Sequence, residues 1–160
     1  NAALLDGALG AVAGLDPVDG AGPIPIGPDE PDFPELTPDR VGALTIPTLY
    51  QGGEVSGKQV LGQACAPTEE NYHEFYTYSP SPSVEVKFLG ADHTDFVAQF
   101  PLDPCNIGTA DHTRVKRLAK KYAVSFLNYY LRGWSRFADE FAGSGIDADQ
   151  TAGDVTWQQK

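Results

Sequence analysis

Methionine is absent from this 160-residue sequence, and cysteine and histidine are scarce, with two cysteines and three histidines. Long apolar runs are missing too, since no stretch approaches the roughly 20 residues that a membrane-spanning helix needs. Basic residues are half as frequent as acidic ones, 11 against 22, which gives a formal net charge of -11. Such a chain is repelled by nucleic-acid phosphates and by anionic membrane surfaces. We therefore expect no transmembrane segment and no nucleic-acid partner.

The two cysteines, Cys65 and Cys105, are an even number in a proline-rich, acidic chain without methionine. This composition is typical of proteins from oxidising compartments, so it predicts a Cys65–Cys105 disulfide and a secreted or periplasmic location. The alternative is two buried free thiols, because cysteine is among the most often buried residue types. The sequence also opens at Asn1 inside a run rich in Ala, Leu and Gly, so we expect further sequence upstream of it.

Hydrophobic patterning predicts alternating helices and strands. The expected elements are a helix over 1–9, strands over 11–15 and 46–51, a short helix over 69–76, a strand near the sheet edge over 84–89, and a long helix over 115–131. The run over 11–15 is short, small and uncharged, which suits a strand buried on both faces of a parallel sheet. The alternation predicts an α/β fold with a parallel sheet flanked by helices.

Two segments fall outside this alternation. Residues 17–45 are rich in proline, glycine and acidic residues, so they cannot sustain a helix or a central strand and are expected to form a long surface loop. Residues 143–160 are polar, and we expect a loosely held C-terminal extension there. The main domain is thus predicted to span residues 1–142.

Asp16 and His93 are the candidate catalytic residues. Asp16 directly follows the predicted strand over 11–15, and His93 follows the strand over 84–89. Catalytic groups in open α/β sheets gather beyond the carboxyl ends of strands. An acid followed by a histidine is the chain order of the second half of a Ser, Asp, His triad. The alternative is that Asp16 only begins an Asp-Pro turn and that His93 caps a loop.

Three stretches of the sequence resemble known esterase families. Residues 14–20, Gly-Leu-Asp-Pro-Val-Asp-Gly, resemble a chlorophyllase motif whose first aspartate, here Asp16, is the triad acid. Cys65-Ala66-Pro67, Asn71 and the run over 73–76 resemble a chlorophyllase segment before the catalytic histidine. Platelet-activating-factor acetylhydrolases share the early position of the acid. Residues 118–141 are similar to the end of secreted cutinase-like polyester hydrolases. One departure is Asp92, which precedes His93 where these families usually have glycine or serine.

This resemblance implies the C-terminal half of an α/β-hydrolase fold and a serine hydrolase of carboxylic esters. His93 would be the general acid and base, Asp16 would orient it, and no cofactor would be needed. The sequence has no Gly-x-Ser-x-Gly, and Ser56 is a poor nucleophile candidate within Gly-Glu-Val-Ser-Gly over 53–57. The nucleophile elbow is therefore expected upstream of Asn1, on the N-terminal portion of the same hydrolase. Glu54 is the alternative acid, because it follows the next predicted strand, where cutinase-like enzymes have their acid. Asp19 is the third candidate.

The resemblance leaves the ester open: a small-molecule, lipid or polymeric substrate is compatible with it. Two other functions also remain open. The first is a metal-dependent hydrolase, whose candidate ligands are Asp92, His93 and Asp95, with Asp111-His112 and His73-Glu74. The second is a secreted, acidic, non-enzymatic interaction module that binds through the proline-rich loop and an aromatic cluster. Those aromatic residues are Tyr72, Phe75, Tyr76 and Tyr78, and the alternative for them is core packing.

Overall fold

The protein forms a mixed four-stranded sheet with helices on both faces, in a computed structural model that describes residues 9–19, 35–97 and 103–160. The strand order is β1-β2-β5-β6. Strands β1 (Val12–Leu15), β2 (Thr48–Gly53) and β5 (Ser83–Phe88) are parallel, and β6 (Val155–Gln159) is antiparallel to β5. A separate antiparallel ribbon pairs β3 (Gln59–Val60) with β4 (Gln63–Ala64). The expected α/β class is confirmed at this level.

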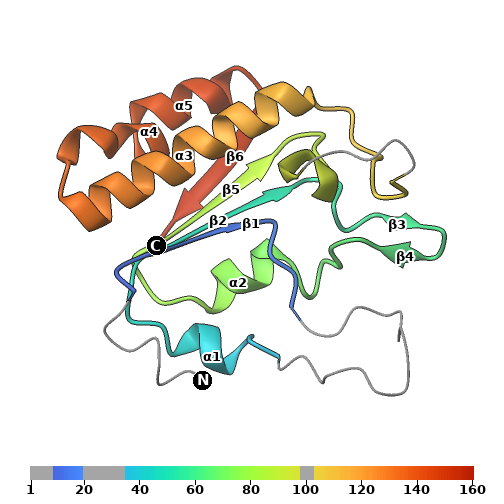
Figure 1. The fold of residues 1–160 in the computed structure, drawn as a ribbon, viewed down its shortest axis with the longest axis horizontal. Helices are drawn as coiled ribbons and strands as arrows, with labels where there is room; N and C mark the ends of the chain where they lie inside the picture. The colour runs from blue at the N-terminus through green and yellow to red at the C-terminus, as the bar shows by residue number, and fades with distance from the viewer. Residues whose placement is uncertain (1–8, 20–34, 98–102) are drawn as a thin grey trace.

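Helices cover the two faces of the sheet in separate groups (Figure 1). One face carries α3 (His112–Arg132), α4 (Asp139–Ala142) and α5 (Ser144–Thr151). The other carries α1 (Asp39–Gly42) and α2 (Tyr72–Tyr78). None of the helices in the described ranges is long and apolar enough to cross a membrane.

Two hydrophobic cores result from the alternation of side chains along the strands. Leu49 of β2 packs in the core shared with α3, whereas its neighbour Tyr50 packs in the core shared with α2. Phe88 of β5 contacts Tyr122 of α3, and both side chains are buried. The sheet is therefore held from both sides, which fixes the positions of the strand ends.

The long helix α3 confirms the helix that hydrophobic patterning predicts over 115–131. Asp111 caps its N-terminus by accepting hydrogen bonds from the backbone N–H groups of Thr113 and Arg114. Gly133 ends it with φ at 68°, a left-handed conformation that glycine adopts without steric cost. The helix begins at His112, before the predicted 115, because its first turn is polar and is set by the cap.

The shorter elements agree with the predictions to within a few residues. Strand β2 covers 48–53 where 46–51 was expected, and α2 covers 72–78 where 69–76 was expected. Helix α2 starts later because its capping residue is Asn71, whose side chain accepts from the His73 N–H. The helix expected over 1–9 lies almost entirely outside the described residues. Within the predicted long loop, residues 20–34 are not described, and the remainder contains α1.

The expectation of a loosely held extension over 143–160 is wrong. Residues 144–151 form α5, and β6 completes the sheet beside β5, so β5 is not at the edge. Ile146 and Val155 are buried, and Asp149 accepts hydrogen bonds from Lys121 and Tyr122 of α3. A few buried apolar residues within a polar segment thus anchor it, which composition alone does not reveal.

Strand β1 lies at an edge of the sheet rather than at a position buried on both faces. Most of its residues are half-buried, and Leu15 is 48% exposed. Only β2 pairs with it among the described residues. The small apolar sequence of β1 is typical of an interior strand, although no described strand pairs with its outer edge.

Candidate active site

Asp16 and His93 meet at the carboxyl edge of the parallel strands. Asp16 directly follows β1, and His93 follows β5 through a short loop. Because β1, β2 and β5 are parallel, their carboxyl ends lie along one edge of the sheet. The Nδ1 atom of His93 is 2.9 Å from Oδ2 of Asp16, although the residues are 77 positions apart. The structure thus brings together the acid and the histidine that the sequence singles out.

The Asp16 carboxylate is buried and accepts two hydrogen bonds at one oxygen. Its Oδ2 atom contacts the His93 ring and also accepts a hydrogen bond of 2.6 Å from the Ser56 hydroxyl. The second oxygen, Oδ1, is buried and has no hydrogen-bond partner among the described residues. The backbone of Asp16 has φ at 41°, in the left-handed region that only a few residue types besides glycine tolerate, aspartate among them. This turn directs the carboxylate toward His93.

His93 is oriented to exchange a proton. When Nδ1–H donates to Asp16, the lone pair of Nε2 remains available to accept a proton. The hydrogen bond to Asp16 is the main cause that raises the pKa of His93 above its usual 6.5, partial burial opposes it, and the charges of Asp16, Asp92 and Asp103 add to the rise. The side chain is 33% exposed, so an external group can reach it.

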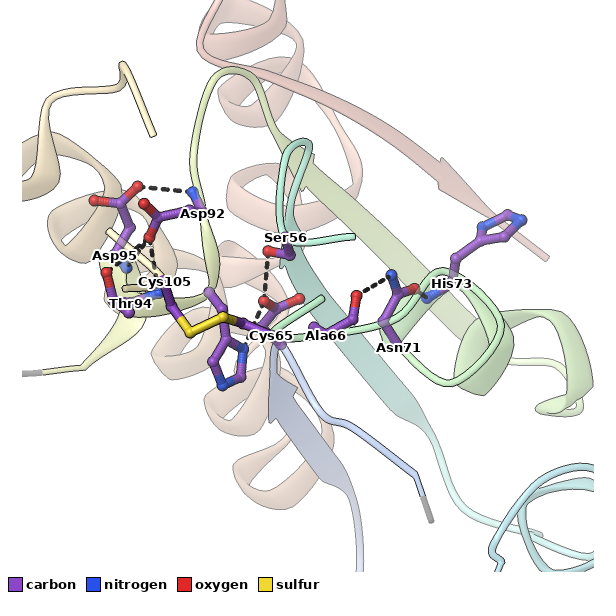
Figure 2. A network of polar contacts seen from close by, with 11 residues as sticks. Ser56, Cys65, Ala66, Asn71, His73, Asp92, Thr94, Asp95 and Cys105 are labelled. Atoms are coloured by element: carbon purple, nitrogen blue, oxygen red, sulfur yellow. Dashed lines mark hydrogen bonds and ion pairs between the residues drawn. A yellow bond between two sulfur atoms is a disulfide. The ribbon is translucent and has the colours of Figure 1, made fainter. Parts of the chain in front are cut away.

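A disulfide joins Cys65 and Cys105, the pairing that the sequence predicts, with their Cα atoms 5.9 Å apart. Cys65 lies in the loop after β4, and Cys105 lies in the loop between the His93 turn and α3. Figure 2 shows this bond together with the neighbouring polar contacts of Ser56 and Asp92. The disulfide therefore connects two loops at the edge of the sheet where the acid and the histidine lie.

Ser56 has a role that the sequence did not reveal. It is buried, and its hydroxyl donates to Asp16 rather than to the histidine. Ser56 therefore supports the acid and does not occupy the position of a nucleophile next to His93. Its place follows from a tight turn after β2, where a Cβ at Gly53 would lie 2.6 Å from the Ser56 Oγ. No sequence signal available to us identified this contact, because Ser56 and Asp16 are 40 residues apart.

The two other acids considered for the triad make different contacts. Glu54, the alternative acid, is exposed, and its Oε2 accepts a hydrogen bond of 2.9 Å from the Gly90 N–H. Asp19 accepts hydrogen bonds from the backbone of Leu36 and from the backbone and hydroxyl of Thr37. Neither carboxylate has a described hydrogen bond to the His93 ring, so Asp16 is its acidic partner.

The residues considered for a metal site are not gathered in one place. Across the described ranges, no group of three or more His, Cys, Asp and Glu side chains could hold a metal ion. Each histidine instead contacts a carboxylate of its own. These pairs are His73 with Glu85, His93 with Asp16 and His112 with Asp95.

The aromatic cluster considered for partner binding is mainly part of the core. Tyr72, Phe75 and Tyr76 are buried against Tyr50 and Val41, and only Tyr78 is substantially exposed, at 42%. Core packing therefore accounts for three of its four members, and no described feature favours an interaction module.

A cavity of about 650 Å³ lies apart from the Asp16–His93 pair. It opens between α2 and β6, where Tyr72, His73, Glu85 and Trp157 are among its lining residues. Neither Asp16 nor His93 lines it, so the cavity gives no information about the substrate of the acid and histidine pair.

Comparison with models of known protein families gives no match for this chain, and comparison with curated proteins gives none either.

Proposed function

We propose that this chain supplies the acid and the base of a serine hydrolase that acts on carboxylic esters, with an α/β-hydrolase fold. The observation that carries the proposal is the 2.9 Å contact between His93 Nδ1 and the buried Asp16 carboxylate, at the carboxyl ends of parallel strands. The chain order of the two residues and the chlorophyllase-like motif around Asp16 support the same assignment.

The proposed chemistry divides between the two residues. His93 takes the proton from a serine hydroxyl through Nε2 and later donates it to the departing alkoxide. Asp16 holds the imidazole in the tautomer with hydrogen on Nδ1 and stabilises the imidazolium that forms. The hydrogen bond to Asp16 raises the pKa of His93, which stabilises the imidazolium relative to that of a free imidazole. The reaction proposed here needs no cofactor.

The nucleophilic serine of this proposal comes from other polypeptide. All seven serines of the sequence lie in the described ranges, and none of their hydroxyls has a described hydrogen bond to His93. The segments that are not described, 1–8, 20–34 and 98–102, contain no serine, threonine or cysteine. We therefore propose that the N-terminal portion of the same hydrolase carries the serine.

The outer edge of β1 is the proposed contact with that portion. Parallel strands with a small, apolar sequence normally lie inside a sheet with a neighbouring strand on each side, whereas a strand at the edge exposes unpaired backbone N–H and C=O groups. Beside this edge the apolar side chains of Leu9 and Leu15 are exposed, and Leu131 of α3 lies against Gly10. The Oδ1 atom of Asp16 also supports this contact, because it has no hydrogen-bond partner in the described part of the chain and a buried carboxylate oxygen normally accepts one.

The proposed substrates are carboxylic esters of small-molecule, lipid or polymeric type. The disulfide is compatible with an oxidising compartment, and we propose that the protein is secreted or periplasmic. These assignments follow the esterase families that the sequence resembles.

Labelling with a fluorophosphonate tests this function. The protein is produced together with its upstream polypeptide, labelled, digested and mapped by mass spectrometry. We expect one modified serine, outside residues 1–160. Replacing His93 with alanine should lower ester turnover and the labelling rate by roughly 10³-fold or more.

His73→Ala is the matched control, because His73 also contacts a carboxylate, Glu85, but lies away from Asp16. It should retain nearly normal activity. Labelling of a serine within this chain, or equal activity of the His93 and His73 variants, would contradict the proposal.

A further inference from the structure

We propose that Asp92 is a positioning residue, which holds the turn that carries His93 in register with Asp16. The inference rests on the proposed function, because positioning matters only if His93 acts as a base. Asp92 is the residue at which this sequence departs from the families that it resembles.

The Asp92 carboxylate is buried and fully engaged. Its side chain is among the most completely buried polar groups of the described chain, with 1% relative exposure. Oδ1 accepts hydrogen bonds from the Thr94 N–H, the Thr94 hydroxyl and the Asp95 N–H, at 2.8, 2.8 and 3.1 Å. Oδ2 accepts from the N–H groups of Ile107 and Gly108, both at 2.6 Å. Hydrogen bonds to a charged acceptor are the stronger kind, so this set is a rigid anchor.

These contacts join the turn that begins at His93 to the segment that leads into α3, and Figure 2 shows Asp92 beside Thr94 and Asp95 of that turn. Oδ1 caps the short 3-10 helix His93–Phe96, and Oδ2 holds the segment that leads into α3. The approach is close at Gly108, where a Cβ would lie 2.9 Å from Asp95 Oδ2 and 3.1 Å from Asp92 N. A side chain at position 108 would therefore push the segment away from the carboxylate.

Asp95 extends the anchor to the long helix. Its Oδ2 atom accepts from the Asp92 N–H at 2.9 Å, which completes a capping box around the turn. Its Oδ1 atom is 3.0 Å from Nδ1 of His112, the first residue of α3. The backbone of His93 is thus fixed from both sides and tied to the largest helix of the fold.

The charge of Asp92 also affects the pKa of His93, and a variant of Asp103 separates this effect from the positioning. The charges of Asp92 and Asp103 both raise the pKa of His93. Asp103, however, accepts its hydrogen bond from the Cys105 N–H and has no described hydrogen bond to the His93 turn. Asp103→Asn therefore removes a charge alone, whereas Asp92→Asn removes a charge and the anchor.

Kinetics of the complete protein on a soluble ester test the role. In Asp92→Asn the amide nitrogen can only donate, so the side chain can no longer accept hydrogen bonds at both Oδ1 and Oδ2 positions, and the turn should shift. We expect kcat to fall by roughly 10- to 100-fold with KM changed less than about twofold, since small misplacement of a catalytic group has effects of this size. Asp103→Asn should keep kcat within about twofold. Gly108→Ala, which keeps every charge, should lower kcat in the same manner as Asp92→Asn.

Nuclear magnetic resonance of the 160-residue chain gives a readout that does not need esterase activity. The Nδ1 proton of His93, shielded by Asp16, should be visible in the wild type and in Asp103→Asn, and should be lost or broadened in Asp92→Asn and Gly108→Ala. The pKa of His93 should decrease in both aspartate variants.

The outcomes separate the two proposals. A wild type without esterase activity but with these proton signals would contradict the proposed function alone. Asp92→Asn and Gly108→Ala that both match Asp103→Asn, in kcat and in the proton signal, would overturn the positioning role. Should Asp92→Asn fail to fold, the Gly108→Ala result decides.

Discussion

Replacing Cys65 and Cys105 together with serine is expected to lower the free energy of unfolding by about 4 kcal/mol. The disulfide closes a loop between residues 40 positions apart. In the chain-entropy model, a loop of this length restricts the unfolded chain by roughly 13 cal/mol/K, which is about 3.9 kcal/mol near room temperature. Such a loss is a large fraction of the total stability of a typical domain.

Urea unfolding followed by tryptophan fluorescence measures this loss. With a slope of about 2 kcal/mol per molar urea, the midpoint should fall by about 2 M. The wild type treated with a reductant should unfold at the midpoint of the double variant, whereas the double variant should not respond to the reductant. A midpoint change below about 0.5 M would refute the reasoning, because the loop between the two cysteines would then be constrained in the unfolded chain without the bond.

Three further predictions concern His93, Ser56 and the last strand, β6. Because the pKa of His93 is raised above 6.5 when folded, its contribution to stability is complete below that value and is lost as the pH rises through the folded pKa. His93→Gln should remove this part of the pH dependence, measured by urea unfolding at several pH values, and an unchanged profile would contradict the assignment. Ser56→Ala should lower stability by about 1.5 to 3 kcal/mol, since it removes a hydrogen bond to a buried carboxylate, and a loss below about 0.5 kcal/mol would argue against that bond. Deletion of residues 155–160 should abolish cooperative thermal unfolding, because β6 covers one edge of β5 and buries Val155; retained cooperativity would show that β6 is dispensable.

Local signals predicted the elements whose formation depends on neighbouring residues. Hydrophobic patterning located α3 and the end of β1, and it located β2 to within two residues. The sequence also placed Asp16 and His93 after strands, which is sufficient to expect them at one edge of a parallel sheet.

Long-range partners could not be read in this way. Three sets of hydrogen bonds depend on the register between strands and on the paths of the loops. They are the bond from Ser56 to Asp16, the bond from the Gly90 N–H to Glu54, and the bonds that Asp92 accepts. The tail over 143–160 illustrates the same limit, since its composition is polar but two buried residues fix it to the sheet.

The sequence by itself thus determined the α/β class and the long helix, and it singled out the pairs Cys65 with Cys105 and Asp16 with His93. Only the tertiary structure decided that Asp16, and not Glu54, contacts His93, that no described strand covers the outer edge of β1, and that β6 closes the opposite side. The physical reason is the sequence separation over which each interaction acts. Periodicity, caps and turns act over a few residues, whereas a hydrogen bond across 77 residues exists only after the whole sheet has set the distance between its strand ends.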